Sequence, residues 1–428
     1  MTATDTHRAI EAIWRIESAR LIAGLARFVR DVGVAEDLAQ DAFVTALEKW
    51  PVTGIPERPG AWLMATAKHR GIDVLRRSKL HGRKEEDVVR EIEALRERNA
   101  PDPDAALDDD VGDDLLRLIF TACHPALSME SRVALTLRLL GGLTTEEIAR
   151  AFLVPVPTVQ QRIVRAKRTL SEERVAFDPL PAGERAARVS SVLEVIYLIF
   201  NEGYTATAGD DWMRPELCED ALRLGRILTH IAPAESEVHG LLALMELQAS
   251  RTRARTGPSG EPIRLLDQNR SLWDPLLVNR GLAALERARG LGGADEPYAL
   301  QAAIAAVHAR ARKAEETDWA GIASHYDALA RRVPSPIVEL NRAVAHGMAF
   351  GPAAGLGKVE PLLAEPTLAG YHLLPAVRGD LLFRLGRFAE ARGDFERAAG
   401  LTRNERERVL MLERAAACAA PADGDGTR

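Results

Sequence analysis

Helical periodicity restricts the fold of this chain more than any other feature. Apolar residues recur at intervals of three and four along most of the sequence, while alternating runs of β-branched residues are scarce. The first spacing places apolar side chains on one face of an α-helix, whereas alternation is the pattern of a β-strand. Alanine, leucine, arginine and glutamate dominate the composition. We therefore expect an all-α fold.

Length and local charge indicate how the chain is divided. Its 428 residues suffice for two or three domains that each bury a core. The formal net charge of −6 averages over segments of opposite sign. Residues 68–84 contain seven lysines and arginines against one carboxylate, whereas residues 85–114 are acidic and contain two prolines. The acidic segment predicts a solvated linker between two modules.

Several classes of protein do not fit the sequence. Cys123, Cys218 and Cys418 lie far apart in a pattern that indicates neither a disulfide framework nor a zinc site. The N-terminal segment lacks the apolar core of a signal peptide, and no segment has the length of a membrane span. Polar clusters supply neither a nucleophile–base pair nor a metal set. We therefore expect a cytoplasmic chain with no membrane contact, metal, cofactor or catalytic activity.

The segment from Leu143 to Leu170 has the pattern of a helix-turn-helix. Thr144 or Thr145 is placed to cap a short helix, and prolines at 155 and 157 break that helix and begin the next. The first helix has an apolar face of Ile148, Ala149 and Phe152, and the second has one of Val159, Ile163, Ala166 and Leu170.

The other face of the second helix is rich in glutamine and cations: Gln160, Gln161, Arg162, Arg165, Lys167 and Arg168. Glutamine and arginine make bidentate contacts to adenine and guanine edges, while lysine and arginine hold phosphates. This face therefore predicts a helix that reads duplex DNA. The alternative is a basic helix that is merely solvated.

Two further helices are expected nearer the N-terminus. Residues 35–50 are amphipathic and should end at Trp50-Pro51, since proline disfavours helix at its own position and at the preceding one. Residues 59–77 carry Trp62 near their start and a basic end. Cations beside an aromatic ring suit a nucleic-acid strand with unstacked bases. A core role for Trp62 is the more common alternative.

These motifs, in this order, resemble an extracytoplasmic-function (ECF) sigma factor of RNA polymerase. The resemblance covers about residues 10–175 and implies a region-two domain over 10–84, a linker over 85–114 and a region-four domain over 115–175. It further implies a chain that binds core RNA polymerase, through the β′ clamp helices and the β flap, together with promoter DNA. Such a chain directs promoter-specific transcription initiation.

The resemblance also assigns roles to individual residues. It implies contacts to core polymerase from Asp37, Gln40, Asp41 and Phe43. Contacts to the melted minus-ten element are implied for Trp62, Lys68, His69, Arg70, Arg76 and Arg77. The helix from Thr158 to Arg168 would read the minus-thirty-five duplex. His69 stands where the family usually has asparagine, and Leu153 and Pro157 replace glycines of the turn.

Residues 179–420 are expected to form a helical extension, followed by a disordered tail at 421–428. The extension resembles the tetratricopeptide-like C-terminal region of one subgroup of these sigma factors. The spacing is carried by Gly379, Leu382, Gly386, Phe388, Ala391, Phe395 and Ala398, and earlier by Trp319, Ile322, Tyr326, Leu329 and Pro334. An irregular helical bundle is the alternative. Polar clusters at 201–212 and 267–273 predict either a surface for a protein or small ligand, or ordinary helix ends and loops.

Two other functions remain open at this point. A stand-alone helix-turn-helix regulator with a C-terminal sensor or scaffold domain would bind duplex DNA without polymerase, and it would leave the first block unexplained. A helical-repeat enzyme or scaffold would require a catalytic constellation that the sequence does not supply.

Overall fold

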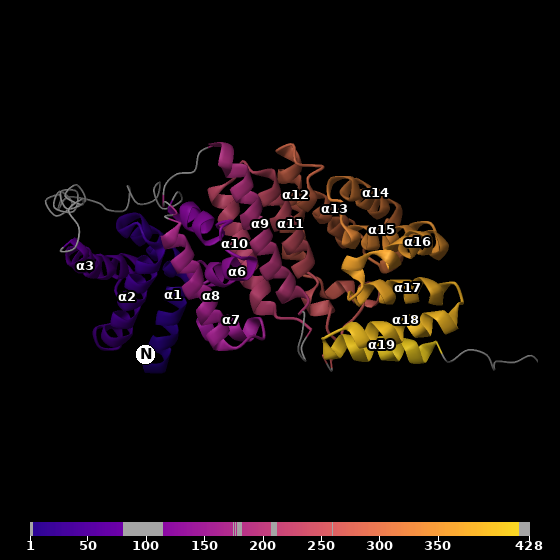
Figure 1. Ribbon diagram of the computed structural model, residues 1–428, viewed down its shortest axis with the longest axis horizontal. Coiled ribbons are helices and arrows are strands. Elements are labelled where there is room, and N and C mark those ends of the chain that lie inside the picture. Colours follow the sequence, from indigo (N-terminus) through magenta and orange to yellow (C-terminus); the bar gives the residue numbers. More distant parts are fainter. Residues whose placement is uncertain are drawn as a thin grey trace, which may run out of the picture. The chain divides into compact units, whose positions relative to one another are not determined.

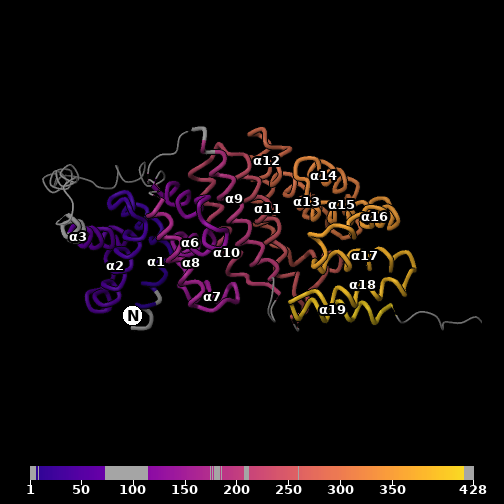
Figure 2. Tube along the Cα trace, viewed as in Figure 1, coloured from indigo at the N-terminus to yellow at the C-terminus, as the bar shows by residue number. Residues whose placement is uncertain are grey.

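The structure is a computed structural model, drawn as a ribbon in Figure 1 and as a Cα trace in Figure 2. It describes residues 3–79, 114–173, 175, 177, 182–206, 212–258 and 260–418. These residues form helices without a strand, apart from one isolated bridge between Thr256 and Pro262, so the predicted all-α fold is confirmed. The predicted linker lies outside the described residues except for Asp114, and the predicted tail lies outside them entirely.

The chain divides into two compact units, Met1–Ile196 and Tyr197–Arg428. The division falls inside one long helix, α9 (Ala182–Tyr204). Within the first unit, the Ser191 hydroxyl of α9 donates to the Cys123 carbonyl at 2.9 Å and accepts from Arg132 at 3.1 Å. The start of the long extension is therefore part of the core of the first unit.

Three helices begin the first unit: α1 (Ala3–Val29), α2 (Val32–Thr53) and α3 (Pro59–Lys79), which pack against one another. The turn between α1 and α2 places Arg30 at a left-handed φ of 55°. Asp31 then caps α2 by accepting a hydrogen bond from the Val34 N–H at 2.9 Å. The apolar side of α2 is buried as predicted: Leu38, Ala42, Thr45 and Ala46.

Helix α2 does not end at Trp50-Pro51, and that prediction was wrong. It continues to Thr53, with Pro51 in its last turn. A proline costs little there, because only one backbone hydrogen bond is lost and few residues follow. Trp50 is buried and its ring meets Trp62 edge to face, 5.2 Å between centroids, which adds packing at this turn. Gly54 closes the helix at a φ of 84°, and its N–H donates to the Trp50 carbonyl.

The rest of the first unit contains a helical segment over 114–122, α6 (Met129–Leu139), α7 (Thr145–Ala151) and α8 (Val156–Glu172). Helix α8 packs on α6 and α7. Thr144 and Glu147 form a capping box at the start of α7, so two of its exposed backbone N–H groups are satisfied. Pro157 lies in the first turn of α8, as the sequence predicted.

The second unit is a succession of helices in which neighbours along the chain pack together. In order they are α10 (Pro215–Ile231), α11 (Ser236–Ala249), α12 (Pro275–Gly290), α13 (Pro297–Arg310), α14 (Trp319–Arg332), α15 (Pro336–Ala349), α16 (Pro352–Val359), α17 (Leu373–Arg384), α18 (Phe388–Leu401) and α19 (Glu405–Ala417). Three 3₁₀ turns lie between α11 and α12, at Thr252–Ala254, Leu265–Asp267 and Arg270–Leu272. Nearest-neighbour packing is the arrangement expected of a helical-repeat domain.

The later set of residues that suggested a repeat, from Gly379 to Ala398, lies in one tightly packed helix pair, while the earlier set lies in and just after α14. A Cβ on Gly379 of α17 would lie 2.9 Å from the Phe395 ring of α18, so this crossing requires glycine. Gly386 makes the turn between the two helices at a φ of 74°. Ala391, Phe395 and Ala398 are buried against α17 and α19. The packing agrees with the sequence spacing, while the tetratricopeptide assignment itself stays a prediction.

Candidate nucleic-acid interface

Helix α8 separates a buried apolar stripe from a polar face. The predicted inner residues Val159, Ile163, Ala166 and Leu170 are all buried. On the other side Gln160, Gln161, Arg165 and Arg168 are exposed, while Thr158, Arg162 and Lys167 are half-buried. Arg168 pairs with Glu172 one turn on, at 2.7 Å. The exposed glutamines and arginines have the chemistry to contact base edges and phosphates.

The turn between α7 and α8 carries local strain. Leu153, which replaces a turn glycine, is exposed and has a left-handed φ of 50°. A β-carbon makes this conformation unfavourable. Glycine, which has none, adopts it readily, and asparagine and aspartate tolerate it better than other residues do. The turn is closed by hydrogen bonds from the Leu153 N–H to the Arg150 carbonyl and from the Val154 N–H to the Ala149 carbonyl. Leucine therefore keeps the shape of the turn at an energetic cost.

The middle of α3 presents basic side chains on the surface of the region-two module. Lys68, His69 and Arg70 are exposed, and Arg70 pairs with Asp41 of α2 at 3.1 Å. Trp62 is half-buried against Trp50, so it acts at least partly as a packing residue. Arg76 and Arg77 lie in α3, but their side chains are outside the described part of the structure.

The four residues expected to contact polymerase lie along α2. Asp37 and Asp41 are exposed and Gln40 is half-buried. Phe43, also half-buried, packs its ring 4.6 Å from that of Trp14 in α1. Asp41 forms an ion pair with Arg70, and Asp37 accepts a hydrogen bond from Lys167 of α8 at 3.2 Å. Predicted residues of three different sites thus contact one another within the first unit.

Glu36 is the important residue that sequence reasoning missed. It is 2% exposed, and its carboxylate meets Arg138 Nε of α6 at 2.7 Å and Lys167 Nζ of α8 at 2.6 Å. The Glu36 triad, as we term these three residues, therefore joins the region-two and region-four modules. A sequence signal was present, because Glu36 shares the helical face of Ala35 and Ala39, where an apolar residue is expected.

Other contacts follow the same junction. Arg15 of α1 pairs with Glu147 of α7 at 3.0 Å. Gly142, with a φ of 70°, lies against α1, where an added Cβ would come 3.0 Å from the Ser18 hydroxyl. The two modules are therefore packed closely, with a predicted DNA-reading residue and a predicted polymerase-binding residue at the contact.

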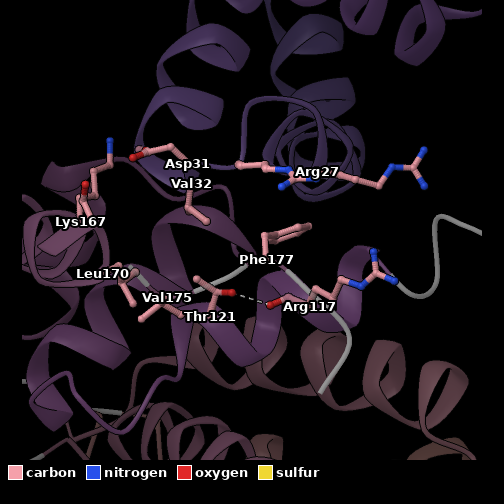
Figure 3. A pocket seen from close by; sticks show the side chains of 12 residues that line it. Arg27, Asp31, Val32, Arg117, Thr121, Lys167, Leu170, Val175 and Phe177 are labelled. Atoms are coloured by element: carbon pink, nitrogen blue, oxygen red, sulfur yellow. Dashed lines mark hydrogen bonds between the residues drawn. The ribbon is translucent and has the colours of Figure 1, made fainter. Parts of the chain in front are cut away.

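A cavity of about 350 Å³ opens at this junction. Figure 3 draws the side chains that line it. Its walls carry Arg27, Arg30, Arg117 and Lys167 against a single lining carboxylate, Asp31. Three of the four cations already have acidic partners: Arg27 and Arg117 pair with Asp114, at 3.3 and 3.1 Å, and Lys167 pairs with Glu36. The cavity is therefore cationic in composition but largely neutralised by its surroundings.

Three protein families match successive parts of the chain. Sigma-70 region 2 matches residues 16–80, and Sigma-70, region 4 matches residues 117–170. A family of unknown function (DUF6596) matches residues 188–289, which begin in α9 and end in α12. The class is therefore a protein with two sigma regions followed by a helical extension.

Two relatives define the family of this chain more closely. An uncharacterized protein of Rhizobium meliloti (strain 1021) is 42% identical over 391 residues, which cover 90% of each chain. The probable ECF RNA polymerase sigma factor SigI of Mycobacterium tuberculosis is 29% identical over 181 residues, covering 42% of this chain and 60% of that one. The present chain belongs to the ECF sigma factors and carries a C-terminal extension. As a sigma factor it binds core RNA polymerase and promoter DNA and directs transcription initiation.

Among the described residues, no helix combines the length and apolar character needed to cross a bilayer. The same residues hold no group of three or more histidine, cysteine, aspartate or glutamate side chains arranged around a metal position.

Proposed function

We propose that this sigma factor reads the upstream promoter element with the exposed face of α8 and the melted minus-ten element with α3. The observation that carries the proposal is the separation of α8 into a buried stripe and an exposed face of Gln160, Gln161, Arg165 and Arg168. Phosphate contacts from the cations supply salt-dependent affinity, and glutamine and arginine discriminate bases.

Core polymerase is proposed to dock on the region-two module through the surface of α2. Asp37 and Asp41 offer exposed carboxylates there, and Gln40 offers an amide. Phe43 supports this surface by packing on Trp14. The β′ clamp helices are the proposed partner of α2, and the β flap that of the region-four module. The site of action is the cytoplasm, where polymerase and promoters meet.

The packing seen between the two modules is proposed as a resting arrangement. Lys167 is held by Glu36 and Asp37, at 2.6 and 3.2 Å, so it cannot also hold a DNA phosphate. The same lysine engages the exposed carboxylate of Asp37, a proposed polymerase ligand. Engagement of promoter and polymerase therefore requires the modules to separate.

The C-terminal extension is proposed to regulate or stabilise the sigma modules, as a tetratricopeptide-like domain with a partner of its own. Its length and its succession of packed helix pairs support this role. Such domains present extended concave surfaces formed by successive helices.

Arg165→Ala tests the assignment of α8. We expect the affinity of holoenzyme for promoters to fall about fivefold to tenfold and the salt dependence to weaken by one phosphate contact, with core binding unchanged. Arg392→Ala, which removes an exposed arginine from α18, is the matched control. Equal loss of core affinity, or equal effects of the two substitutions, would show that this face of α8 does not read DNA.

A further inference from the structure

Two polar segments of the extension that lie far apart in sequence come together in the second unit. They form what we term the arginine–aromatic cluster: Tyr204, Trp212, Arg251, Arg255, Arg270 and Trp273. Tyr204 ends α9, and Arg270 and Trp273 lie in the turns before α12. Arg251 joins the two segments, since its guanidinium carbon lies 5.7 Å from the ring centres of both Tyr204 and Trp273.

Two of the arginines hold the walls of the cluster. Arg255 is 5% exposed, with its guanidinium carbon 3.4 Å from the Tyr204 ring centre and 4.3 Å from that of Trp212. It donates to the Tyr204 carbonyl and the Thr205 hydroxyl. Arg270 donates to the carbonyls of His308 and Ala311, at 2.7 and 2.8 Å, and to the Thr317 hydroxyl at 3.0 Å. These hydrogen bonds give both side chains a structural role.

Arg251 has donors to spare. It is half-buried and donates one hydrogen bond within the described structure, to the hydroxyl of Tyr204. A guanidinium group has five N–H donors, arranged so that two can meet the two oxygens of a carboxylate or phosphate. Arg251 is therefore suited to bind a carboxylate or phosphate, whereas Arg255 and Arg270 mainly hold the surrounding residues in place.

The cluster has no direct ion pair within the described residues, although Glu315 and Glu316 act on Arg270 from a longer distance. None of its three guanidinium groups forms an ion pair with a carboxylate of the described chain. Burial lowers the pKa of Arg255 to about 10, and repulsion from Arg251 acts in the same direction. Buried charges are normally paired, because unpaired ones lose their hydration without compensation. Arg255 is buried and Arg251 and Arg270 are half-buried, so these three neighbouring cations leave a positive local potential.

Buried polar atoms around Arg251 also lack partners. The Nε of Arg270, the indole Nε1 of Trp273 and the Nδ1 of His308 have no hydrogen-bond partner among the described residues. Trp273 is 7% exposed and His308 is 8% exposed. Burial, with Arg251 and Arg270 nearby, lowers the pKa of His308 to about 3, so the ring is neutral near pH 7 and one of its nitrogens carries a hydrogen. The Nε of Arg270 and the indole Nε1 of Trp273 are donors, so they call for an acceptor.

We propose that the arginine–aromatic cluster is the binding site for a small-molecule anion, whose carboxylate or phosphate oxygens are held by Arg251. The indole of Trp273 and the guanidinium of Arg270 supply further donors, and the ring of Tyr204 forms an apolar wall. A small molecule fits better than a folded partner, because Trp273 and His308 are more than nine-tenths buried. Binding stands on this cluster alone, whereas an effect of the anion on transcription rests on the proposed function of the extension.

Titration calorimetry on the full-length chain tests the proposal, with inorganic phosphate, pyrophosphate, acetate and citrate as probes at constant ionic strength. We expect saturable binding of one class, phosphates or carboxylates, at one site per chain. Arg251→Gln should weaken it at least about tenfold, the loss typical of a charge-assisted contact. Trp273→Phe keeps the ring, removes the indole donor and should weaken binding less. Arg253→Gln, an exposed arginine of the same turn, should leave affinity unchanged.

Three outcomes would overturn the proposal. They are saturation by none of the four probes, equal losses in Arg251→Gln and Arg253→Gln, and saturation by an acidic peptide alone. Circular dichroism of each variant shows whether the second unit still folds. If the Arg251→Gln variant does not fold, the Trp273→Phe variant still tests the site. Promoter-directed transcription by the unliganded wild-type chain tests the sigma function independently, so either idea can fail without the other.

Discussion

Leu153 shows how one residue can hold a functional turn in an unfavourable conformation. Its φ of 50° lies in the left-handed region, which costs a residue with a β-carbon about 1–2 kcal/mol. We expect Leu153→Gly to raise the free energy of unfolding by about 0.5–1 kcal/mol, because the relief of strain exceeds the added entropy of glycine in the unfolded chain. Urea denaturation followed by circular dichroism measures the change.

Leu153→Ala is the matched control for that substitution. It shortens the exposed side chain but keeps the β-carbon, so the backbone strain remains. If the alanine and glycine variants had equal stability, strain at this turn would be negligible.

His308 gives the second unit an acid-sensitive group. Burial lowers its pKa to about 3, whereas an unfolded histidine titrates near 6.5. The unfolded chain therefore binds more protons between these values, so the contribution of His308 to stability is complete above pH 6.5 and is lost as the pH falls toward 3. We expect the free energy of unfolding to drop by about 2 kcal/mol between pH 6.5 and 4.5 through this group.

His308→Asn should remove this component, so the variant should lose less stability on acidification than the wild type, whatever its stability at pH 7. Denaturant titrations across the pH range measure the difference. His230→Asn, at an exposed position, serves as the control. Parallel pH profiles for wild type and His308→Asn would refute the assignment.

Sequence patterns predicted residues in regular positions and missed those whose role depends on tertiary contact. The buried stripe of α8 and the cap at Thr144 followed from spacing and local chemistry. Glu36 did not, because its partners Arg138 and Lys167 lie more than a hundred residues away. The arginine–aromatic cluster was half predicted: residues 201–212 and 267–273 were identified, but Arg251, which connects them, was not.

Among the helices, the predicted starts held at Thr144, which caps α7, and at Pro157, which lies in the first turn of α8. Pro51, by contrast, was wrongly expected to end α2. The α2 helix continues past the proline because of tertiary packing, since Trp50 is buried against Trp62 at this turn. Local propensity alone cannot account for that packing.

The contact between α2 and α8 yields a prediction about the resting arrangement. Removing one partner of a buried ion pair costs about 3–5 kcal/mol, because the remaining charges are left uncompensated. Glu36→Gln should therefore loosen the packing of the region-four module on the region-two module. We expect faster hydrogen exchange in α6 and α8, and tighter binding of an upstream-element duplex by the free chain, because Lys167 is released.

Asp37→Asn is the control, since the Asp37 side chain is 74% exposed and meets the same lysine at 3.2 Å. An exposed pair contributes about 1 kcal/mol or less, so its loss should change exchange and DNA affinity only slightly. Equal effects of the two substitutions would mean that the Glu36 triad does not hold the modules together.

At the scale of the whole molecule, α9 links the sigma modules to their extension. Its first half is buried in the first unit through Val189, Val192 and Ile196, and its last residues belong to the second unit. A chain cut after Arg174 would therefore remove part of the core of the region-four module along with the extension. Substitutions inside the second unit, such as those in the arginine–aromatic cluster, examine the extension without this disturbance.

Run-off transcription with purified core RNA polymerase distinguishes a sigma factor from a stand-alone DNA-binding regulator. Templates from a panel of promoters of the source genome are compared with and without the full-length chain. We expect transcripts that start at defined promoters only when the chain is present, together with stable binding of the chain to core enzyme. Duplex binding without core binding, and with no promoter-dependent transcript across the panel, would contradict this expectation and favour a stand-alone helix-turn-helix regulator.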